Sequence, residues 1–144
     1  MRIISGKLKG STLYINKNKD TRPLKDLVRE SIFNLLKHSK KISFNFEKSY
    51  ILDLYSGTGS FGLECLSRQA GKVFFVENNE NAIKILQKNI KKLKLELKTE
   101  LYVNDVFYII SKKNIFKKKF DLIFFDPPFK NKNISRLIEI IFYK

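Results

Sequence analysis

The sequence predicts an α/β fold with a parallel, Rossmann-like sheet, and two observations support this prediction. From residue 50 onward, four short apolar runs typical of buried strands alternate with segments whose apolar residues recur at helical spacing. Strands that alternate with helices favour parallel pairing through right-handed crossovers. In addition, a glycine-rich segment at residues 57–62 follows the first strand and opens the first helix, as in nucleotide-binding sheets.

Length and composition restrict the classes of protein to consider. The chain has 144 residues, which suits one domain, with 29 basic and 14 acidic side chains and a net charge of +15. A hydrophobic content of 43% excludes a disordered basic tail as the whole chain. No stretch approaches the roughly 18 apolar residues of a membrane span. A single cysteine, Cys65, and a single histidine, His38, argue against disulfides and metal sites. We therefore expect a cytoplasmic protein without a metal.

Positive charge concentrates at the two ends of the chain. Residues 1–50 carry 12 basic and 4 acidic side chains, residues 51–100 carry 8 and 6, and residues 101–144 carry 9 and 4. Clustered basic residues are typical of nucleic-acid binding. A general enrichment in lysine at solvated positions would give the same total charge, but the clustering favours the nucleic-acid interpretation.

Residues 1–45 are expected to form an appendage to an α/β domain at 46–144. Two short β-prone runs, 2–5 and 12–15, flank a Gly-Lys-Leu-Lys-Gly segment, which predicts a hairpin. A helix is predicted over 24–37, directly after Pro23, a residue that suits a helix start. The expected buried face of this helix consists of Leu27, Val28, Ile32, Leu35 and Leu36.

The α/β domain is predicted to contain four strands and four helices in strict alternation. The strands are expected at 50–55, 72–76, 99–103 and 120–125. The helices are expected at 60–68, 79–95, 106–112 and 133–142.

The glycine-rich segment carries the first chemical motif. Gly57, Gly59 and Gly62 have the G-x-G-x-x-G spacing, and Glu77 lies 20 residues beyond Gly57, at the end of the next strand. Glycines let the backbone approach a ligand closely, and an acidic side chain there can accept both ribose hydroxyl protons. The pattern therefore predicts a cofactor that contains a nucleoside; a tight strand-to-helix turn is the structural alternative.

Asp53 distinguishes between cofactors. A carboxylate just before the glycine segment would repel a pyrophosphate at the helix N-terminus. S-adenosylmethionine has no phosphate and carries a sulfonium and an ammonium group, which a carboxylate attracts. The sequence therefore favours S-adenosylmethionine over NAD, unless Asp53 only orders the loop.

Two further acidic residues follow the third and fourth strands. Asp105 could accept a hydrogen bond from an adenine amino group, or cap the following helix, or do both. Asp126 begins the segment Asp-Pro-Pro-Phe. The Asp126 carboxylate and the Pro127 carbonyl form an acceptor pair suited to a planar amino group, and Phe129 offers a ring on which a base can stack. Such a site would act by orientation and charge stabilisation.

These motifs together resemble those of class I amino-methyltransferases, and the N-terminus narrows the resemblance. Residues 1–10 and 21–34 are similar to the RsmD family of bacterial 16S rRNA guanine-N2 methyltransferases. The resemblance extends from residue 1 to residue 130. It implies an S-adenosylmethionine-binding sheet with its present strands in the order 3-2-1-4, a guanine acceptor, and 16S rRNA or a partly assembled small ribosomal subunit as partner.

The resemblance also implies roles for particular residues. Those expected to bind the cofactor are Thr21, Arg22, Pro23, Asp53, Tyr55, Gly57, Gly59, Glu77, Asn78, Asp105 and Val106. Those expected to hold and orient the acceptor amine are Asp126, Pro127, Pro128 and Phe129. Those expected to contact RNA phosphates are Arg2, Lys7, Lys9, Arg22 and Arg29, for which a solvated surface is the alternative.

One departure from the family leaves alternatives open. The family fold continues beyond the Asp-Pro-Pro-Phe segment with further strands, whereas this sequence ends in the next helix. The strand at 120–125 would then have an exposed apolar edge, which predicts self-association. A DNA adenine-N6 methyltransferase, which shares the Asp-Pro-Pro-Phe motif, and a nucleic-acid-binding fragment without catalysis are the alternative functions.

Overall fold

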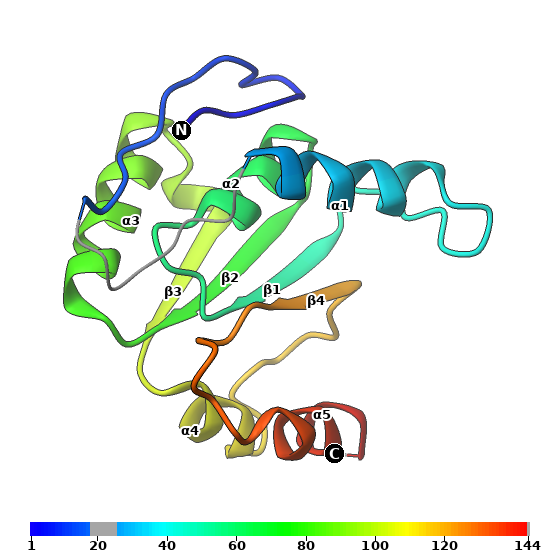
Figure 1. The fold of residues 1–144 in the computed structure, drawn as a ribbon, viewed down its shortest axis with the longest axis vertical. Coiled ribbons are helices and arrows are strands. Elements are labelled where there is room, and N and C mark those ends of the chain that lie inside the picture. Colours follow the sequence, from blue (N-terminus) through cyan, green and yellow to red (C-terminus); the bar gives the residue numbers. More distant parts are fainter. Residues whose placement is uncertain (18–25, 144) are drawn as a thin grey trace.

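The computed structural model describes residues 1–17 and 26–143 and contains one parallel sheet. The strand order is β3-β2-β1-β4, which confirms the prediction (Figure 1). All three pairings are parallel. The strands are β1 (Tyr50–Leu54), β2 (Lys72–Glu77), β3 (Thr99–Val103) and β4 (Leu122–Phe125).

Helices cover both faces of the sheet. In Figure 1, α1, α2 and α3 lie on one side of the strands, and α4 and α5 lie on the other. The helices are α1 (Asp26–His38), α2 (Ser60–Ser67), α3 (Glu80–Lys92), α4 (Val106–Ser111) and α5 (Ile134–Tyr143). A short 3-10 turn, η1 (Glu96–Lys98), was not expected from the sequence.

Alternate residues of the central strands supply two hydrophobic cores. On β2, Val73 and Phe75 pack with α2 and α3, whereas Phe74 and Val76 pack with Val106 of α4 and Leu137 of α5. Because the strands are buried on both faces, their sequences are continuously apolar rather than alternating. This two-sided burial fixes the carboxyl ends of the strands, where the candidate site lies.

The predicted N-terminal hairpin forms only in part. Arg2 and Thr12 make a single antiparallel bridge instead of two paired strands. The connecting segment turns at Gly6 and Gly10, both with φ of 85°, and packs against α2. A Cβ on Gly6 would lie 2.1 Å from the carbonyl oxygen of Ser67, so only glycine permits this approach.

The predicted buried face of α1 is wrong in part: Leu36 is buried and Ile32 packs against the core, but the other three residues are exposed. Leu27, Val28 and Leu35 are 75%, 44% and 57% exposed, while Arg29, Phe33 and Leu36 are buried. Phe33 stacks against Phe61 with ring centroids 5.0 Å apart, and it also contacts Phe46. Aromatic packing and the bonded Arg29 therefore set the rotation of the helix, against its aliphatic pattern. The predicted helix start at Pro23 lies outside the described residues.

β4 forms one edge of the sheet. No strand of the described residues pairs with its outer edge, and it begins at Leu122, two residues later than expected. Self-association through residues 120–125 therefore stays a prediction. None of the described helices is long and apolar enough to cross a membrane.

Candidate cofactor and acceptor site

The four predicted acidic residues meet at one edge of the sheet. Asp53 is the next-to-last residue of β1, and Glu77 is the last residue of β2. Asp105 and Asp126 follow β3 and β4. Parallel pairing brings these carboxyl ends together. The charges of Glu77 and Asp126 act on Asp53, and those of Asp105 and Glu77 act on Tyr55. This edge therefore gathers acidic side chains, although the chain as a whole is basic.

The glycine loop has the geometry of a ligand-binding turn. Gly57 and Gly59 have φ of 57° and 87°, conformations that favour glycine. A Cβ on Gly57 would meet no atom within 4 Å, so the space beside it is open to a ligand. Gly62 has a different role: a Cβ there would lie 2.4 Å from the Phe75 ring, so Gly62 permits the packing of α2 on β2.

Glu77 joins the glycine loop to the end of β2. Its carboxylate accepts hydrogen bonds from the backbone N–H groups of Gly57 at 2.7 Å and of Asn78 and Asn79 at 2.9 Å each. A carboxylate has about four lone-pair sites, so about one remains for a ligand. The sequence predicts two ribose hydroxyl bonds at Glu77, whereas this geometry favours one.

Asp53 is buried beside the same loop. It is 1% exposed, and its carboxyl accepts a hydrogen bond of 3.1 Å from the backbone N–H of Gly62. Burial, followed by the charges of Glu77 and Asp126, raises the pKa of Asp53 to about 8 against a lowering by the Gly62 bond. This contact ties β1 to the first turn of α2, a structural role for Asp53. Attraction of a cationic cofactor by Asp53 stays a prediction.

The raised pKa of Asp53 predicts a pH-dependent stability. Between the ordinary value of 3.8 and about 8, the folded chain keeps a proton that the unfolded chain releases, so this group makes stability fall as pH rises. The contribution is up to about 1.4 kcal/mol per pH unit. Asp53→Asn removes it and keeps an acceptor for Gly62. In urea unfolding from pH 5 to pH 8, we expect the variant to gain stability relative to wild type as pH rises; a constant difference contradicts the assignment.

The remaining predicted cofactor residues surround the loop. The Asp105 carboxylate caps α4 by accepting from the N–H of Tyr108 at 3.1 Å, which confirms its capping role. Val106 is buried in the first turn of that helix, and Asn78 is exposed after β2. Tyr55 adopts a positive φ of 57°. Thr21, Arg22 and Pro23 lie outside the described residues.

The Asp-Pro-Pro-Phe loop presents its polar groups to solvent. Asp126 is exposed, its carboxylate has no hydrogen-bond partner among the described residues, and partial burial raises its pKa. Phe129 is 98% exposed, so its ring is available for stacking. Asn131 was missed by the sequence analysis: its amide donates to the Tyr55 hydroxyl at 3.0 Å and its N–H donates to the Pro128 carbonyl at 2.8 Å. Asn131 thereby joins the two loops.

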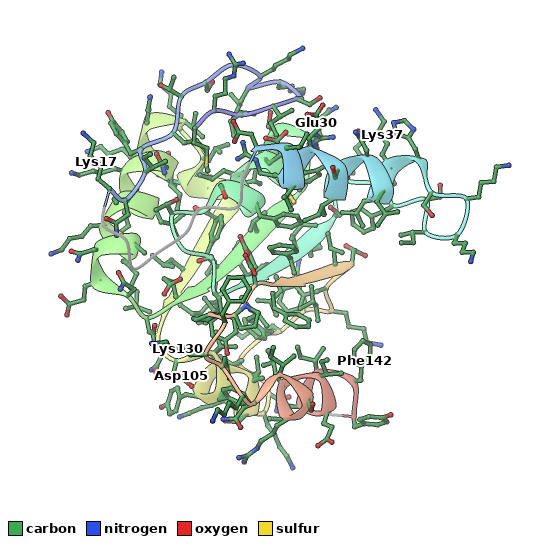
Figure 2. The ribbon with its side chains drawn as sticks, viewed as in Figure 1. Lys17, Glu30, Lys37, Asp105, Lys130 and Phe142 are labelled. Carbon is green, nitrogen blue, oxygen red and sulfur yellow. The ribbon has the colours of Figure 1, made fainter. Side chains whose placement is uncertain are left out.

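The predicted RNA-contacting residues divide into two groups. Arg2, Lys7 and Lys9 are exposed on the N-terminal segment, and lysines such as Lys17 and Lys37 project from the surface (Figure 2). The prediction for Arg29 is wrong, because its side chain is buried and cannot reach a phosphate.

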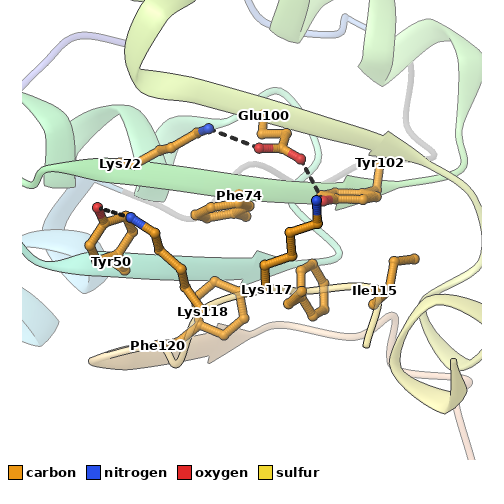
Figure 3. Close-up of a pocket in the computed structure, with 10 residues that line it drawn as sticks. Tyr50, Lys72, Phe74, Glu100, Tyr102, Ile115, Lys117, Lys118 and Phe120 are labelled. Carbon is orange, nitrogen blue, oxygen red and sulfur yellow. Dashed lines mark hydrogen bonds and ion pairs between the residues drawn. The ribbon is translucent and has the colours of Figure 1, made fainter. Parts of the chain in front are cut away.

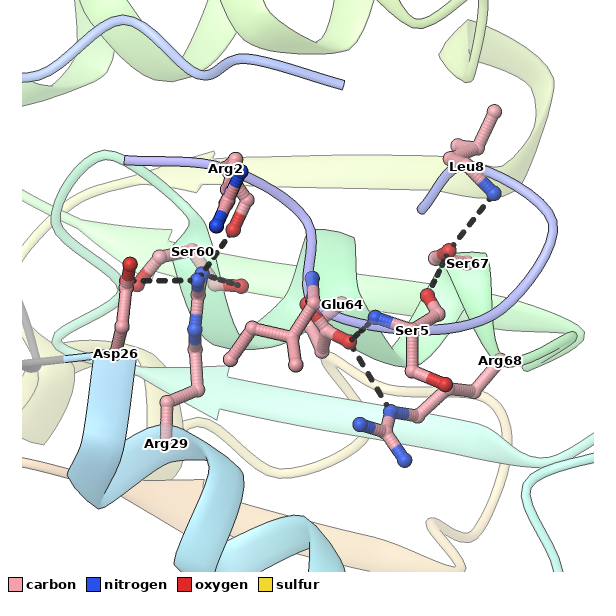
Figure 4. Close-up of polar contacts among 10 residues, drawn as sticks. Arg2, Ser5, Leu8, Asp26, Arg29, Ser60, Glu64, Ser67 and Arg68 are labelled. Carbon is pink, nitrogen blue, oxygen red and sulfur yellow. Dashed lines mark hydrogen bonds and ion pairs between the residues drawn. The ribbon is translucent and has the colours of Figure 1, made fainter. Parts of the chain in front are cut away.

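The Arg29 guanidinium bonds inside the protein instead. It donates to the Arg2 carbonyl at 2.5 Å, to Asp26 at 3.0 Å and to the Ser60 carbonyl at 3.4 Å, as Figure 4 shows. Burial lowers its pKa, against the raising effect of Glu64 and Asp26. Arg22 lies outside the described residues.

Buried polar side chains that the sequence analysis missed fasten the N-terminal segment to the sheet helices. Glu64, fully buried in α2, accepts from the N–H groups of Ile4 and Ser5 at 2.8 and 2.9 Å and from Arg68 at 3.2 Å (Figure 4). Asn89, fully buried in α3, bonds both backbone groups of Tyr14 and also the carbonyl of Thr58 in the glycine loop. A charged residue within the apolar run of α2 was the available sequence signal.

The fold and the site define a class of protein. A parallel sheet in the order 3-2-1-4, helices on both faces, a glycine loop after β1 and acidic residues at the strand ends constitute the class I methyltransferase fold. The described residues contain no group of three or more His, Cys, Asp or Glu side chains that could hold a metal ion.

Comparisons with known proteins identify the family. The family described as Conserved hypothetical protein 95 matches residues 1–144. The ribosomal RNA small subunit methyltransferase D of Buchnera aphidicola subsp. Baizongia pistaciae is 34% identical over 141 residues, covering 98% of this chain and 67% of the relative. Its Haemophilus influenzae counterpart is 35% identical over 129 residues, covering 90% and 64%. The chain belongs to this RsmD-type methyltransferase family.

A solved structure agrees with this membership. The candidate methyltransferase yhhF of Escherichia coli superposes with a TM-score of 0.80 at 27% identity, over 98% of this chain and 71% of that chain. The chain thus spans about two thirds of the length of the relatives it matches.

Proposed function

We propose that this chain is a cytoplasmic enzyme that transfers a methyl group from S-adenosylmethionine to the exocyclic N2 amine of a guanine in 16S rRNA. The observation that carries the proposal is the meeting of an open glycine loop, Glu77 and the Asp126 loop at one edge of the sheet. The names of the relatives, ribosomal RNA small subunit methyltransferase D, support a ribosomal RNA acceptor.

The proposed cofactor position follows the strand ends. Glu77 accepts a ribose hydroxyl, Asp105 and the Val106 backbone take the adenine, and the loop at Gly57 and Gly59 lies along the methionine part. S-adenosylmethionine supplies an activated methyl group. Because S-adenosylmethionine has no phosphate, its binding site needs no basic side chains, which agrees with the acidic residues at this edge.

The proposed acceptor position is the Asp-Pro-Pro-Phe loop. The extruded guanine stacks on Phe129, and its amine donates both protons to the Asp126 carboxylate and the Pro127 carbonyl. This orientation would leave the nitrogen lone pair free to accept the methyl group, with S-adenosylhomocysteine as the leaving group. The Asp126 carboxylate would stabilise the positive charge on the nitrogen and take up the proton that the methylated amine loses. Asn131 keeps the loop near the cofactor side through its bond to Tyr55.

Residues 1–45 are proposed to face the RNA. The bonds of Glu64 and Asn89 hold this segment against α2 and α3, so its exposed Arg2, Lys7 and Lys9 keep a defined position for phosphates. Residues 46–144 form the proposed cofactor-binding domain.

Tritium transfer from labelled S-adenosylmethionine tests the function. Naked 16S rRNA, partly assembled small subunits and duplex DNA are compared as acceptors under the same conditions. Label in ribosomal RNA is the expected result. Label in DNA alone would favour the adenine methyltransferase alternative, and binding of the cofactor without transfer to any acceptor would favour a fragment without catalysis.

Glu77→Ala is expected to weaken S-adenosylmethionine binding by about 1.5–3 kcal/mol, the range for hydrogen bonds to charged groups. The variant loses the acceptor for the ribose and the anchor of the Gly57 N–H. Titration calorimetry measures the change, and circular dichroism confirms that the variant is folded. Glu80→Ala, an exposed residue in the first turn of α3, is the matched control. Equal affinities would remove Glu77 from the site.

RNA affinity is expected to fall linearly with salt on logarithmic axes, with a slope near −0.7 for each phosphate contact on a single strand. Replacing Arg2, Lys7 and Lys9 together by glutamine removes three proposed contacts and should flatten the slope by about 2. The control replaces three exposed lysines of α3 by glutamine, and it should reduce the slope less than the Arg2, Lys7 and Lys9 replacement does. A response to salt that is flat in the wild type contradicts the proposed contacts. The control lysines are Lys84, Lys88 and Lys91.

A further inference from the structure

A pocket lies at the amino ends of the strands, opposite the acidic edge at their carboxyl ends. It has a volume of about 360 Å³, within the size range of small-molecule sites. Tyr50 and Lys72 are the first residues of β1 and β2, and Phe120 lies two residues before β4. Figure 3 shows these side chains around the opening. The glycine loop and the Asp126 loop do not contribute to it.

Aromatic side chains make up half of the residues that line this pocket. The rings are those of Tyr50, Phe74, Tyr102, Phe116 and Phe120. Phe116 contacts Tyr102 and Phe120 edge-to-face, with centroids 5.2 and 4.9 Å apart, and Phe120 contacts Phe74 in the same way at 5.2 Å. Tyr102 and Phe116 remain half-buried. A pocket with rings at its surface suits a flat aromatic ligand.

Three lysines give the pocket a positive rim. Lys72 is paired with Glu100 at 2.8 Å, and Glu100 also accepts from the Tyr102 hydroxyl at 2.5 Å. Lys118 donates to the Tyr50 hydroxyl, an uncharged partner, at 2.8 Å, and Lys117 has no partner among the described residues. Glu100 therefore neutralises one lysine and leaves two cations for an anionic ligand (Figure 3).

The segment that carries this rim is itself basic. Residues 112–119 contain Lys112, Lys113, Lys117, Lys118 and Lys119 and no acidic residue. A single small anion can be bound by one or two cations. A run of lysines beside an aromatic pocket better matches a ligand with several phosphates and a base. A single-stranded nucleic acid has this combination of charges and rings.

We propose that this pocket binds an unpaired nucleotide of single-stranded RNA, with its base against Tyr102 and Phe116 and its phosphate on Lys117 and Lys118. The site would be a second RNA contact at the edge of the sheet opposite the methyl-transfer site. The source of the nucleotide rests on the proposed ribosomal RNA substrate, but the pocket's chemistry does not depend on methyl transfer.

Fluorescence anisotropy without S-adenosylmethionine tests the proposal. The probes are an adenine RNA of about eight nucleotides and the same ribose-phosphate chain without bases, a length within the known range of site sizes. We expect the base-bearing RNA to bind roughly 5- to 150-fold more tightly, since stacking of a base has this effect. Tyr102→Leu should remove most of this preference, while Tyr102→Phe, which keeps the ring, should retain it.

The matched control is Tyr108→Leu, which removes an exposed ring outside this pocket that also lies beside a lysine, Lys112. It should keep the preference for bases, and thermal melts confirm that all variants fold. An equal affinity of wild type for both probes overturns the pocket assignment, as does an equal loss in the Tyr102→Leu and Tyr108→Leu variants. Free AMP that binds more tightly than the RNA overturns the assignment to a strand. Because the assay measures no methyl transfer, a failure of the proposed function leaves these outcomes unchanged.

Discussion

Asp126→Ala should abolish methyl transfer while leaving S-adenosylmethionine affinity unchanged. The exposed Asp126 carboxylate has no hydrogen-bond partner among the described residues, so its proposed contact is with the acceptor amine rather than with the adenosine. Removing a group that stabilises developing charge typically costs about 100- to 1,000-fold in turnover. Tritium transfer to ribosomal RNA and calorimetric titration of the cofactor measure the two quantities.

Asp121→Asn provides the control for Asp126. Asp121 is an exposed acidic residue just before β4, and its carboxylate accepts from the Tyr50 N–H at 2.7 Å; asparagine keeps an acceptor there. This variant should retain transfer. A substantial turnover in Asp126→Ala would contradict the amine-holding role. Since burial raises the pKa of Asp126, wild-type transfer should also decline at acidic pH as the carboxylate takes up a proton.

Glu64→Ala should destabilise the fold by about 3–5 kcal/mol, the typical cost of removing one partner of a buried ion pair. Glu64 is fully buried and carries bonds from Ile4, Ser5 and Arg68. The substitution leaves two backbone N–H groups without an acceptor and removes a favourable charge near Arg29. Domains of this kind have a total stability of about 5–15 kcal/mol, so the loss is a large part of the whole.

Urea unfolding followed by circular dichroism measures this change. Glu30→Ala, the same substitution at an exposed position of α1 (Figure 2), should stay within about 0.5 kcal/mol of wild type. Equal midpoints for Glu64→Ala and wild type would contradict a stabilising role for the Glu64 bonds. Glu64→Gln, which keeps one acceptor oxygen, should fall between the two.

The parallel sheet was predictable because several local features agree. Apolar strands such as Leu122–Phe125, the helical repeat of α3 and the glycine turn all indicate one α/β topology. The boundaries of β3 were predicted to the residue, and those of the other strands within two residues. These elements depend on short-range patterns, which a sequence displays directly.

The rotation of α1 and the burial of Arg29 could not be predicted from the sequence in this way. The aliphatic residues of α1 recur at helical spacing and predict a buried aliphatic face. Phe33 is buried instead, because it packs with Phe46 and Phe61, and this aromatic cluster forms only in the folded chain. In the sequence, Arg29 resembles an exposed cation. In the fold, it is buried and donates hydrogen bonds to the carbonyls of Arg2 and Ser60. Contacts over such sequence separations leave no local pattern.

The candidate site was found from the sequence through its strand-end positions. Glu77 and Asp126 were identified because acidic residues after strands fall at a shared edge. The partners of these residues were missed: Glu77 holds the Gly57 N–H, Asp53 holds Gly62, and Asn131 bonds Tyr55. Each of these bonds joins two segments that are separate along the chain, so its existence depends on the closure of the fold rather than on spacing.

Digestion of the tritium-labelled ribosomal RNA to nucleosides, followed by chromatography, tests the central claim most directly. The samples are partly assembled small subunits treated with wild-type protein, with Asp126→Ala or with no protein, and the untreated sample sets the background. The account predicts label in N2-methylguanosine for wild type and none above background for the variant. Label in a methylated adenosine, or equal label with both proteins, would contradict it.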